Sequence, residues 1–303
     1  MLPEIKSAYL LAEGYESQLE QELAGIVGRH GRLFFSDQPP QNVFWAQNIW
    51  HNPQTHEIES INHAVRTLKQ IQRNWCCYAK DLHRRSALIQ EKLPHISAKP
   101  VVFPSPLPKA TLGSWTLLDK NTLLASPQCS SAFLNGEIYF EEDKTGPPNR
   151  AYLKLWEAFT LMESCPKQGE FCIDAGGSPG GWAWTVAKLG ARVLSVDRAP
   201  LDEKVMNLKE VEFEQGNAFN KKPEDFEKVD WLICDVVCYP EKLLDWVIRW
   251  VESGKAQHMI ATIKFQGEAD YSIAKRFAAI PGSKVQHLFH NKHELTWMWK
   301  REG

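Results

Sequence analysis

The sequence lacks several features that would assign it to a common class of protein. No apolar run approaches the roughly 20 residues that span a bilayer, and residues 1–6 do not place basic residues before a long apolar segment. The seven cysteines are an odd number and form no paired CxxC repeats of the kind that hold zinc. We therefore expect a cytoplasmic chain with free thiols, no membrane partner and no structural zinc.

An excess of positive charge is also missing. Lys and Arg number 35 against 37 Asp and Glu, which gives a formal net charge of −2. Nucleic-acid-binding proteins usually carry a basic balance, because they contact phosphates. If RNA is a partner, the positive charge must be local. Basic sets occur at residues 80–85, 275–276 and 300–301. A solvated helix face explains the first of them equally well.

The chain has no internal repeat and no low-complexity tract, and 303 residues are enough for two cores. Gly146, Pro147 and Pro148 separate a strand-like run at residues 136–140 from a strongly helical pattern. We place a domain boundary here. The prediction is an N-terminal accessory domain over residues 1–146 and a second domain over residues 147–303.

Residues 1–146 mix helical and strand patterns, which predicts an α+β domain. A helix is expected over residues 16–27 and a long helical tract over residues 61–93. Strands are expected near residues 7–12 and 42–46, and again at residues 136–140.

Beyond the boundary, apolar runs rich in β-branched residues alternate with helical stretches. The runs are residues 171–174, 192–197, 230–235 and 258–264, and the helical stretches include residues 181–189 and 241–251. Such alternation is typical of an α/β fold with a doubly wound, mainly parallel sheet. Two more strands, at residues 284–289 and 294–299, are separated only by a short turn. They predict an antiparallel hairpin at one edge.

A glycine-rich turn follows the first of these strands. After Asp174 and Ala175 the chain reads Gly176, Gly177, Ser178, Pro179, Gly180, Gly181 and Trp182. Glycines remove the Cβ atoms that would block a ligand, and a helix N-terminus offers free N–H groups. Asp197 closes the next strand, where an acid can accept hydrogen bonds from both hydroxyls of a ribose. A bound nucleoside cofactor is indicated over the alternative, a ligand-free turn.

The spacing of these glycines does not contain G-x-G-x-x-G, so the dinucleotide fingerprint is not met. A nicotinamide-dependent oxidoreductase therefore remains only as a weaker alternative.

The loop from Asp174 to Trp182, together with residues 190–197 and Pro200, resembles the motifs of the FtsJ-like RNA 2′-O-ribose methyltransferases. The resemblance covers most of residues 147–303. It implies a Rossmann-like methyltransferase fold with a seven-stranded sheet, S-adenosylmethionine as cofactor and RNA as substrate. Within the family, the resemblance is to bacterial members that methylate large-subunit ribosomal RNA and carry an N-terminal RNA-binding region. Ribosomal RNA is the expected partner.

The resemblance also implies a set of cofactor-binding residues. They are Asp174, Gly176, Ser178, Pro179, Gly180, Gly181, Trp182, Asp197, Asn217 and Asp235. Asn217 stands where relatives often carry an aspartate that contacts the adenine amino group. An Asn carbonyl can accept the same hydrogen bond without the charge. Trp182 has an alternative role as a core residue at a helix start.

Members of this family use a Lys-Asp-Lys-Glu tetrad, and the matching positions are Lys154, Asp235, Lys264 and Glu294. The residues themselves agree in part, because Asp235 and Lys264 end predicted parallel strands, where open α/β sheets bind ligands. A lysine is mostly protonated at neutral pH, so a base role for Lys264 requires help from Lys154 and from a sulfonium charge. Asp235 and Glu294 would orient the lysines and the ribose.

Each of these positions also has an ordinary alternative, a solvated lysine at a strand end or an aspartate that caps a helix. An inactive protein of the same fold, which binds RNA or a partner, is a second alternative that the complete tetrad disfavours. The histidines at positions 287, 290 and 293 have no matching ligand set, so the sequence predicts no metal.

Overall fold

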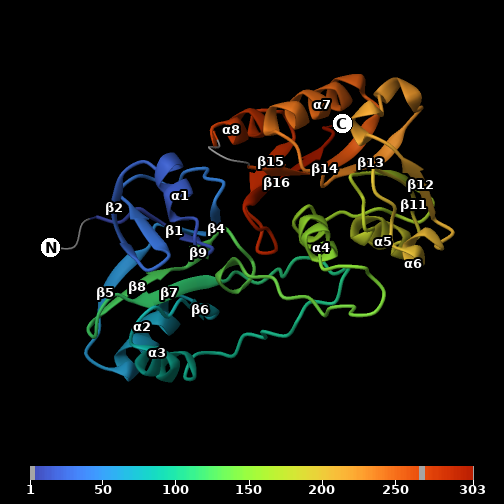
Figure 1. Cartoon of the computed structure of the whole chain (residues 1–303). Helices are drawn as coiled ribbons and strands as arrows, with labels where there is room; N and C mark the ends of the chain where they lie inside the picture. The colour runs from blue at the N-terminus through green and yellow to red at the C-terminus, as the bar shows by residue number, and fades with distance from the viewer. Residues whose placement is uncertain (1–3, 266–269, 303) are drawn as a thin grey trace. The chain divides into compact units, whose positions relative to one another are not determined.

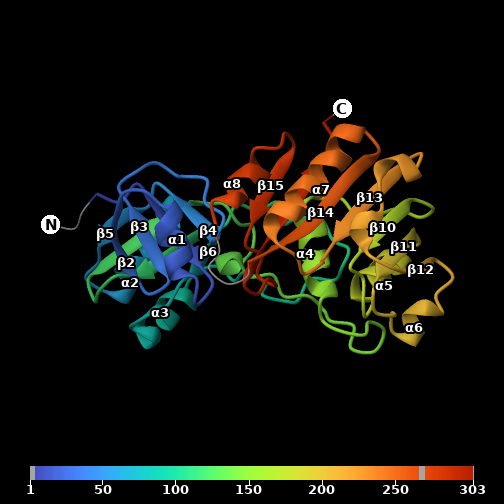
Figure 2. The ribbon, with the colours of Figure 1, turned by 45° about the horizontal axis from the view of Figure 1, so that its top comes forward.

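The computed structural model describes residues 4–265 and 270–302 (Figures 1 and 2). The chain divides into two compact units. One contains Met1–Val101 and Leu107–Tyr139, and the other contains Val102–Pro106 and Phe140–Gly303.

From residue 4 onward, the N-terminal unit contains two sheets and three helices. One sheet has the order β2-β3-β1-β4-β9 and the other the order β5-β8-β7-β6. The strands are β1 (Ser7–Leu11), β2 (Ile26–His30), β3 (Leu33–Ser36), β4 (Ala46–His51), β5 (Gln54–Glu57), β6 (Trp75–Cys77), β7 (Gly113–Leu117), β8 (Thr122–Ser126) and β9 (Gln128–Cys129). The helices are α1 (Glu16–Glu22), α2 (Ile61–Ile71) and α3 (His83–Gln90), and a short 3-10 turn, η1, spans Leu134–Gly136. Helices and strands are therefore mixed, as expected.

Several predicted boundaries in this unit are wrong. The helix that begins at Glu16 ends at Glu22, and Gly25, with a φ of +67°, turns the chain into β2. The helical tract expected over residues 61–93 is two helices with β6 between them. Long-range pairing overrides the local pattern here, because β6 lies parallel to β7 and Trp75 is fully buried. Residues 42–45 and 136–140 do not form strands.

The C-terminal unit is built on one seven-stranded sheet of order β12-β11-β10-β13-β14-β16-β15. Its strands are β10 (Phe171–Ala175), β11 (Arg192–Asp197), β12 (Val211–Gln215), β13 (Val229–Cys234), β14 (Ala256–Lys264), β15 (Ser283–Gln286) and β16 (Glu294–Lys300). The first five strands pair in parallel, whereas β16 is antiparallel to both β14 and β15. The predicted doubly wound sheet with an antiparallel edge hairpin is confirmed.

Helices cover both faces of this sheet, α4 and α5 on one face and α7 and α8 on the other (Figure 1). The helices are α4 (Tyr152–Leu161), α5 (Gly181–Lys188), α6 (Glu203–Met206), α7 (Pro240–Ser253) and α8 (Ile273–Ala278), and two 3-10 turns are η2 (Ala218–Asn220) and η3 (Pro223–Asp225). The boundaries of α7 follow from its sequence. Pro240 occupies its first turn, and Gly254 ends it with a φ of +76°.

An aromatic cluster fixes α4 against the rest of the C-terminal unit. Phe103, from the segment Val102–Pro106, stacks on Trp156 with ring centroids 4.7 Å apart. Phe140 meets both rings edge-on. Because contacts between aromatic rings add to the free energy of burial, this cluster holds α4 in a defined position.

Among the described helices, none combines the length and the apolar character needed to cross a membrane.

Candidate active site

The glycine loop, residues 176–181, follows β10 and leads directly into α5. Gly176 has a φ of +80° and Gly180 a φ of +114°, both in the left-handed region that favours glycine. A Cβ on Gly176 would lie 2.5 Å from a methyl group of Val236, in the loop that follows β13. A larger residue at Gly176 would therefore be strained and crowded. The loop follows β10 at the carboxyl end of the sheet, where open α/β sheets bind ligands.

Asp197 ties the glycine loop to the end of β11. One of its carboxylate oxygens accepts a hydrogen bond from the Ser178 N–H at 3.0 Å, and the other accepts from the Ala199 N–H at 3.0 Å. Each carboxylate oxygen has two lone pairs, so both can accept a further bond from a ribose hydroxyl. Ser178 itself donates its hydroxyl to the Pro200 carbonyl, and Pro179 lies between it and Gly180. These residues fit a nucleoside cofactor.

Asp174 lies beneath the loop and is fully buried. The Ser195 hydroxyl donates to one of its oxygens at 3.2 Å, and the other oxygen has no hydrogen-bond partner among the described residues. Burial raises the pKa of Asp174 to about 7, with smaller contributions from Asp235 and Asp197. A side chain on Gly177 would collide with both Ser195 and Asp174, so this glycine is needed for packing.

Two further predicted cofactor residues are engaged within the protein. Trp182 is 3% exposed, and its ring N–H donates to the Ala151 carbonyl at 3.0 Å just before α4. It offers little surface to a ligand and instead supports α4. The Asn217 side chain accepts from the Phe219 N–H and caps η2. Asn217 is only partly buried, so its amide group can still be reached by a ligand.

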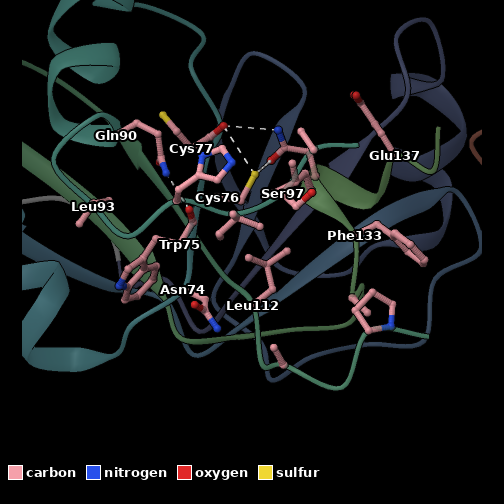
Figure 3. Close-up of a pocket in the computed structure, with 18 of the residues that line it drawn as sticks. Asn74, Trp75, Cys76, Cys77, Gln90, Leu93, Ser97, Leu112, Phe133 and Glu137 are labelled. Atoms are coloured by element: carbon pink, nitrogen blue, oxygen red, sulfur yellow. Dashed lines mark hydrogen bonds between the residues drawn. The ribbon is translucent and has the colours of Figure 1, made fainter. Parts of the chain in front are cut away.

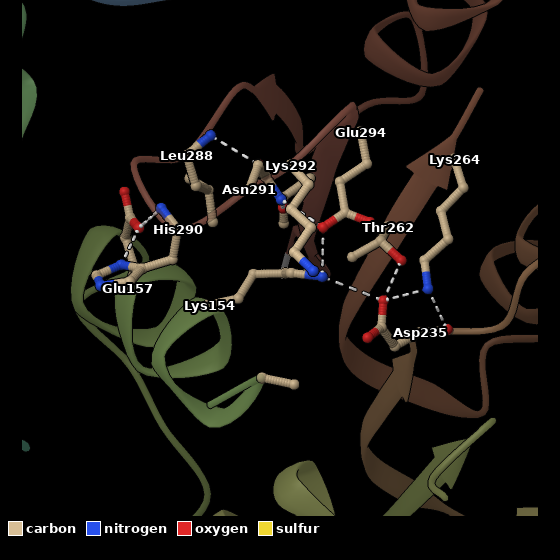
Figure 4. A network of polar contacts seen from close by, with 12 residues as sticks. Lys154, Glu157, Asp235, Thr262, Lys264, Leu288, His290, Asn291, Lys292 and Glu294 are labelled. Atoms are coloured by element: carbon tan, nitrogen blue, oxygen red, sulfur yellow. Dashed lines mark hydrogen bonds and ion pairs between the residues drawn. The ribbon is translucent and has the colours of Figure 1, made fainter. Parts of the chain in front are cut away.

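A row of alternating charges lies at the same end of the sheet as the glycine loop (Figure 4). This charged network consists of Lys264, Asp235, Lys154 and Glu294. The Lys264 Nζ lies 2.9 Å from Asp235 Oδ1, and the Lys154 Nζ lies 3.3 Å from the same oxygen. Lys154 also contacts Glu294 Oε1 at 2.5 Å. The structure therefore brings all four predicted residues together, although they are separated by up to 140 positions in the sequence.

The fold explains this convergence. Asp235 directly follows β13, Lys264 ends β14, and Glu294 begins β16 as the antiparallel partner of Lys264. The fourth member, Lys154, reaches the network from α4. Parallel strands β13 and β14 end where antiparallel β16 begins. Asp235, Lys264 and Glu294 therefore lie at the same end of the sheet. The two strands β10 and β13 are neighbours in the sheet, which places the glycine loop beside the network.

The charges of the network stabilise one another. Burial alone would raise the pKa of Asp235, but Lys154 and Lys264 lower it below its ordinary value. Burial alone would lower the pKa of Lys154, but Asp235 and Glu294 raise it above its ordinary value. Asp235 is therefore a carboxylate and Lys154 an ammonium at neutral pH. The carboxylate of Asp235 also stands between the two lysines, an arrangement that the sequence did not predict.

Sequence reasoning missed two polar side chains of this site. The Thr262 hydroxyl donates to Asp235 Oδ1 at 2.6 Å, and Asn291 donates to Glu294 Oε1 at 3.4 Å. Thr262 could have been found from the sequence, because a residue two positions before Lys264 on a strand lies on the same face. Asn291 carries no such signal.

A hollow of about 1050 Å³ lies within the N-terminal unit, along β6 and α3 (Figure 3). Two of its polar side chains are already engaged: Gln90 donates to the Trp75 carbonyl, and Asn135 donates to the Cys77 carbonyl. Burial raises the pKa of the Cys76 and Cys77 thiols to about 12, so neither is a nucleophile at neutral pH.

The seven cysteines are all free thiols. Across the described residues, no group of three or more His, Cys, Asp or Glu is placed to hold a metal ion.

Comparisons with known proteins agree with this geometry. Residues 147–292 match the model of the family described as FtsJ-like methyltransferase. The chain is similar to proteins named Ribosomal RNA large subunit methyltransferase M. The one from Thauera aminoaromatica is 30% identical, over 49% of this chain and 45% of that protein. The one from Azoarcus sp. (strain BH72) is 32% identical over the same shares. The one from Marinomonas sp. (strain MWYL1) is 25% identical over 83% of this chain and 71% of that protein. The chain thus spans about half the length of the first two relatives.

Proposed function

We propose that this chain, whose residues 147–292 match the FtsJ-like methyltransferase model, transfers a methyl group from S-adenosylmethionine to a ribose 2′-hydroxyl of RNA. The observation that carries this proposal is the charged network beside the glycine loop. A cofactor held by the loop and a hydroxyl held by the network would meet at the carboxyl ends of β10 and β13. The names of the relatives support ribosomal RNA as the substrate.

In this proposal Lys264 is the base. The Asp235 carboxylate beside it favours the ammonium form, so Lys264 must release a proton before it can act. A neutral amine has two N–H groups and one lone pair, and Lys264 has two close acceptors, Asp235 Oδ1 at 2.9 Å and the Asp235 carbonyl at 2.6 Å. With both N–H groups engaged, the lone pair points away from Asp235. It can then take the proton of a ribose hydroxyl as the new O–C bond forms. When bound, S-adenosylmethionine supplies the methyl group and a positive sulfonium charge that favours the neutral amine.

The remaining members of the network would orient the reacting groups. Asp235 holds Lys264, while Lys154 stays an ammonium between Asp235 and Glu294 and can donate to the ribose. The cofactor would be held by the backbone of Gly176, Gly180 and Gly181 and by the carboxylate of Asp197. A nicotinamide cofactor stays the weaker alternative, because the glycine loop does not have the G-x-G-x-x-G spacing.

An exposed apolar surface beside the network suits a large substrate. Val237 and Tyr239, which follow Asp235 in the chain, are 71% and 68% exposed. Tyrosine rings offer a stacking surface to unpaired bases. We infer that this loop contacts the nucleotide that carries the reacting ribose.

The test is to map 2′-O-methyl groups in RNA from cells with and without this protein. The proposal predicts at least one ribosomal position that loses its 2′-O-methyl group when the protein is absent and regains it with the wild-type chain. A set of ribose methylations that is unchanged would contradict the proposal. The affinity of the purified protein for the RNA should also fall steeply with salt, despite the net charge of −2, because phosphate contacts release counterions.

A further inference from the structure

The acid on α4, Glu157, lies one turn after Lys154 and faces away from the network (Figure 4). Glu157 is 2% exposed. Its carboxylate accepts from the backbone N–H groups of Phe289 at 2.8 Å and His290 at 2.9 Å, and from the His290 ring Nδ1 at 2.7 Å (Figure 4). Within the described part of the chain, all the hydrogen-bond partners of this carboxylate come from one loop, between β15 and β16.

A carboxylate in such a position is costly unless its charge is compensated. Three N–H donors provide the compensation here, two of them from the backbone. Such donors fix the position of the loop more strictly than apolar packing would, because hydrogen bonds depend on distance and direction. Glu157 therefore attaches the loop to α4 at a defined place.

The same loop leads to Glu294. The Asn291 side chain accepts from the Leu288 N–H at 2.7 Å and donates to Glu294 Oε1 at 3.4 Å. Glu294 in turn meets Lys154, which lies on α4 beside Glu157. A closed ring of contacts thus runs from α4 through the loop to Glu294 and back to α4.

We propose that Glu157 is a positioning residue, which holds the loop over residues 288–293 against α4 so that Glu294 meets Lys154 in the geometry needed for methyl transfer. This inference rests on the proposed function, because Lys154 and Glu294 are its working residues. Glu157 itself touches neither the cofactor loop nor the other members of the network through any described hydrogen bond. Its effect would pass through Asn291 and Glu294.

The primary variant is Glu157→Gln, which keeps the size of the side chain but leaves one acceptor oxygen for three donors. The matched control is Glu170→Gln. Glu170 also accepts a backbone N–H, from Lys167, and a ring N–H, from Trp231. It precedes β10, at the edge of the sheet opposite the network. Both variants lose one carboxylate, but only the first should disturb the network.

Two readouts are needed. The first is methyl transfer to RNA, measured below the melting temperature and expressed per cofactor-binding site. Glu157→Gln should lower kcat by about 10–100-fold, the effect of a small misplacement of reacting groups. The affinity for S-adenosylmethionine should stay within about twofold, because the glycine loop is untouched. Glu170→Gln should change neither quantity.

The second readout does not depend on activity. The rate at which Lys154 is acylated by an amine reagent is followed by mass spectrometry, because an amine reacts only in its neutral form. If the loop over residues 288–293 is no longer held against α4, Lys154 loses its contact with Glu294. Lys154 should then be acylated faster in Glu157→Gln than in the wild type. Lys209 lies outside the network, with a side chain that is 91% exposed, and serves as the internal reference.

The outcomes separate the two proposals. Wild-type kcat together with wild-type acylation of Lys154 in Glu157→Gln would overturn the positioning role. A wild-type protein that transfers no methyl group to RNA would overturn the proposed function, whereas the acylation rates would still decide the role of Glu157. If Glu157→Gln does not fold, His290→Ala and His290→Asn replace it. His290→Asn keeps a side-chain N–H and should retain more transfer than His290→Ala, and wild-type transfer in both would again overturn the inference.

Discussion

The glycine loop and the charged network lie at the same edge of one sheet, but they are built from different parts of the chain. The glycine loop is continuous in sequence and would contact a cofactor through its backbone. Asp197, the side chain that bonds to the loop, comes from the next strand. The network consists of four side chains from β14, β16, α4 and the end of β13, joined by direct ion pairs. A site that holds a cofactor can be made of backbone, whereas a site that moves a proton needs titratable side chains.

Two acids of these regions, Asp174 and Asp235, show the same contrast. Asp174 pairs in register with Ile233 on β13, and Asp235 follows that strand two positions later. Asp235 has two lysine partners, which lower its pKa. Among the described residues, no cation compensates the burial of Asp174, and its pKa rises to about 7. Burial without a compensating cation raises the pKa of Asp174, whereas two neighbouring cations lower the pKa of Asp235.

The largest expected effect separates chemistry from binding. Lys264→Ala should lower methyl transfer by about 10²–10⁴-fold, the usual contribution of a general base, while cofactor binding and the fold are retained. Lys264→Arg should do no better, because a guanidinium keeps its proton in proteins. The rate is measured with saturating cofactor, and circular dichroism checks the fold. Transfer near the wild-type rate in either variant would make Lys264 an ordinary surface lysine.

The next effect sharpens the contrast between the two acids. An acid whose pKa is raised by folding destabilises the protein as pH rises from its unfolded pKa, about 3.9, to its folded pKa. Asp174→Asn removes this loss. Its free energy of unfolding, relative to the wild type, should therefore grow by about 2–4 kcal/mol between pH 4 and pH 7 and level off above pH 7. Urea unfolding across this range checks the slope. A difference that does not vary with pH would mean that folding does not raise the pKa of Asp174.

Asp235→Asn should do the opposite. Asp235 has a lowered pKa, so its stabilisation is present above the unfolded pKa and is lost as pH falls through the folded pKa. At pH 7 the variant should lose about 3 kcal/mol, since it leaves two lysines without their shared carboxylate. The loss should shrink at low pH. Unfolding of this variant and of Asp174→Asn in the same buffers gives the comparison, and equal pH profiles would contradict it.

Asp197→Ala tests the glycine-loop side alone. The variant should bind S-adenosylmethionine more weakly by about 1–3 kcal/mol, the cost of losing an acceptor in a desolvated pocket. Its rate of transfer at saturating cofactor should change far less. Calorimetry supplies the affinity. Unchanged affinity would place the cofactor elsewhere.

The smallest effect concerns the Thr262 hydroxyl on β14, which donates to Asp235. Thr262→Val removes one donor to Asp235 and should lower transfer by about fivefold, which corresponds to a net hydrogen bond of about 1 kcal/mol. The affinity for the cofactor should not change. A loss as large as that of Lys264→Ala would mean that Thr262 itself takes part in the chemistry.

The sequence predicted these two regions unequally well. The glycine loop could be found from the residues, because its glycines are adjacent and Asp197 ends the next apolar run. Of the network, only Asp235 and Lys264 carried a signal of their own, as polar residues that end apolar strands. Lys154 and Glu294 were placed by the family resemblance. Their meeting depends on the position of α4 and on the register of β16 with β14, which no local pattern contains.

The other features that the sequence did not predict, β6 and the role of Glu157, have the same cause. Residues 75–77 form a strand only because β7, more than 30 positions later, is available as a parallel partner. Glu157 resembles any acid on an amphipathic helix until its partners, 132 and 133 positions away, are known. Interactions between distant segments decide such features, and a single sequence does not report them.

The most direct test of the central claim is product analysis in vitro. The wild-type protein and Lys264→Ala are incubated with ribosomal RNA and isotopically labelled S-adenosylmethionine, at concentrations that give equal cofactor occupancy. The RNA is then digested to nucleosides. Our account predicts a labelled 2′-O-methyl nucleoside from the wild type and almost none from the variant. Label on a base, no label from the wild type, or equal label from both proteins would contradict it.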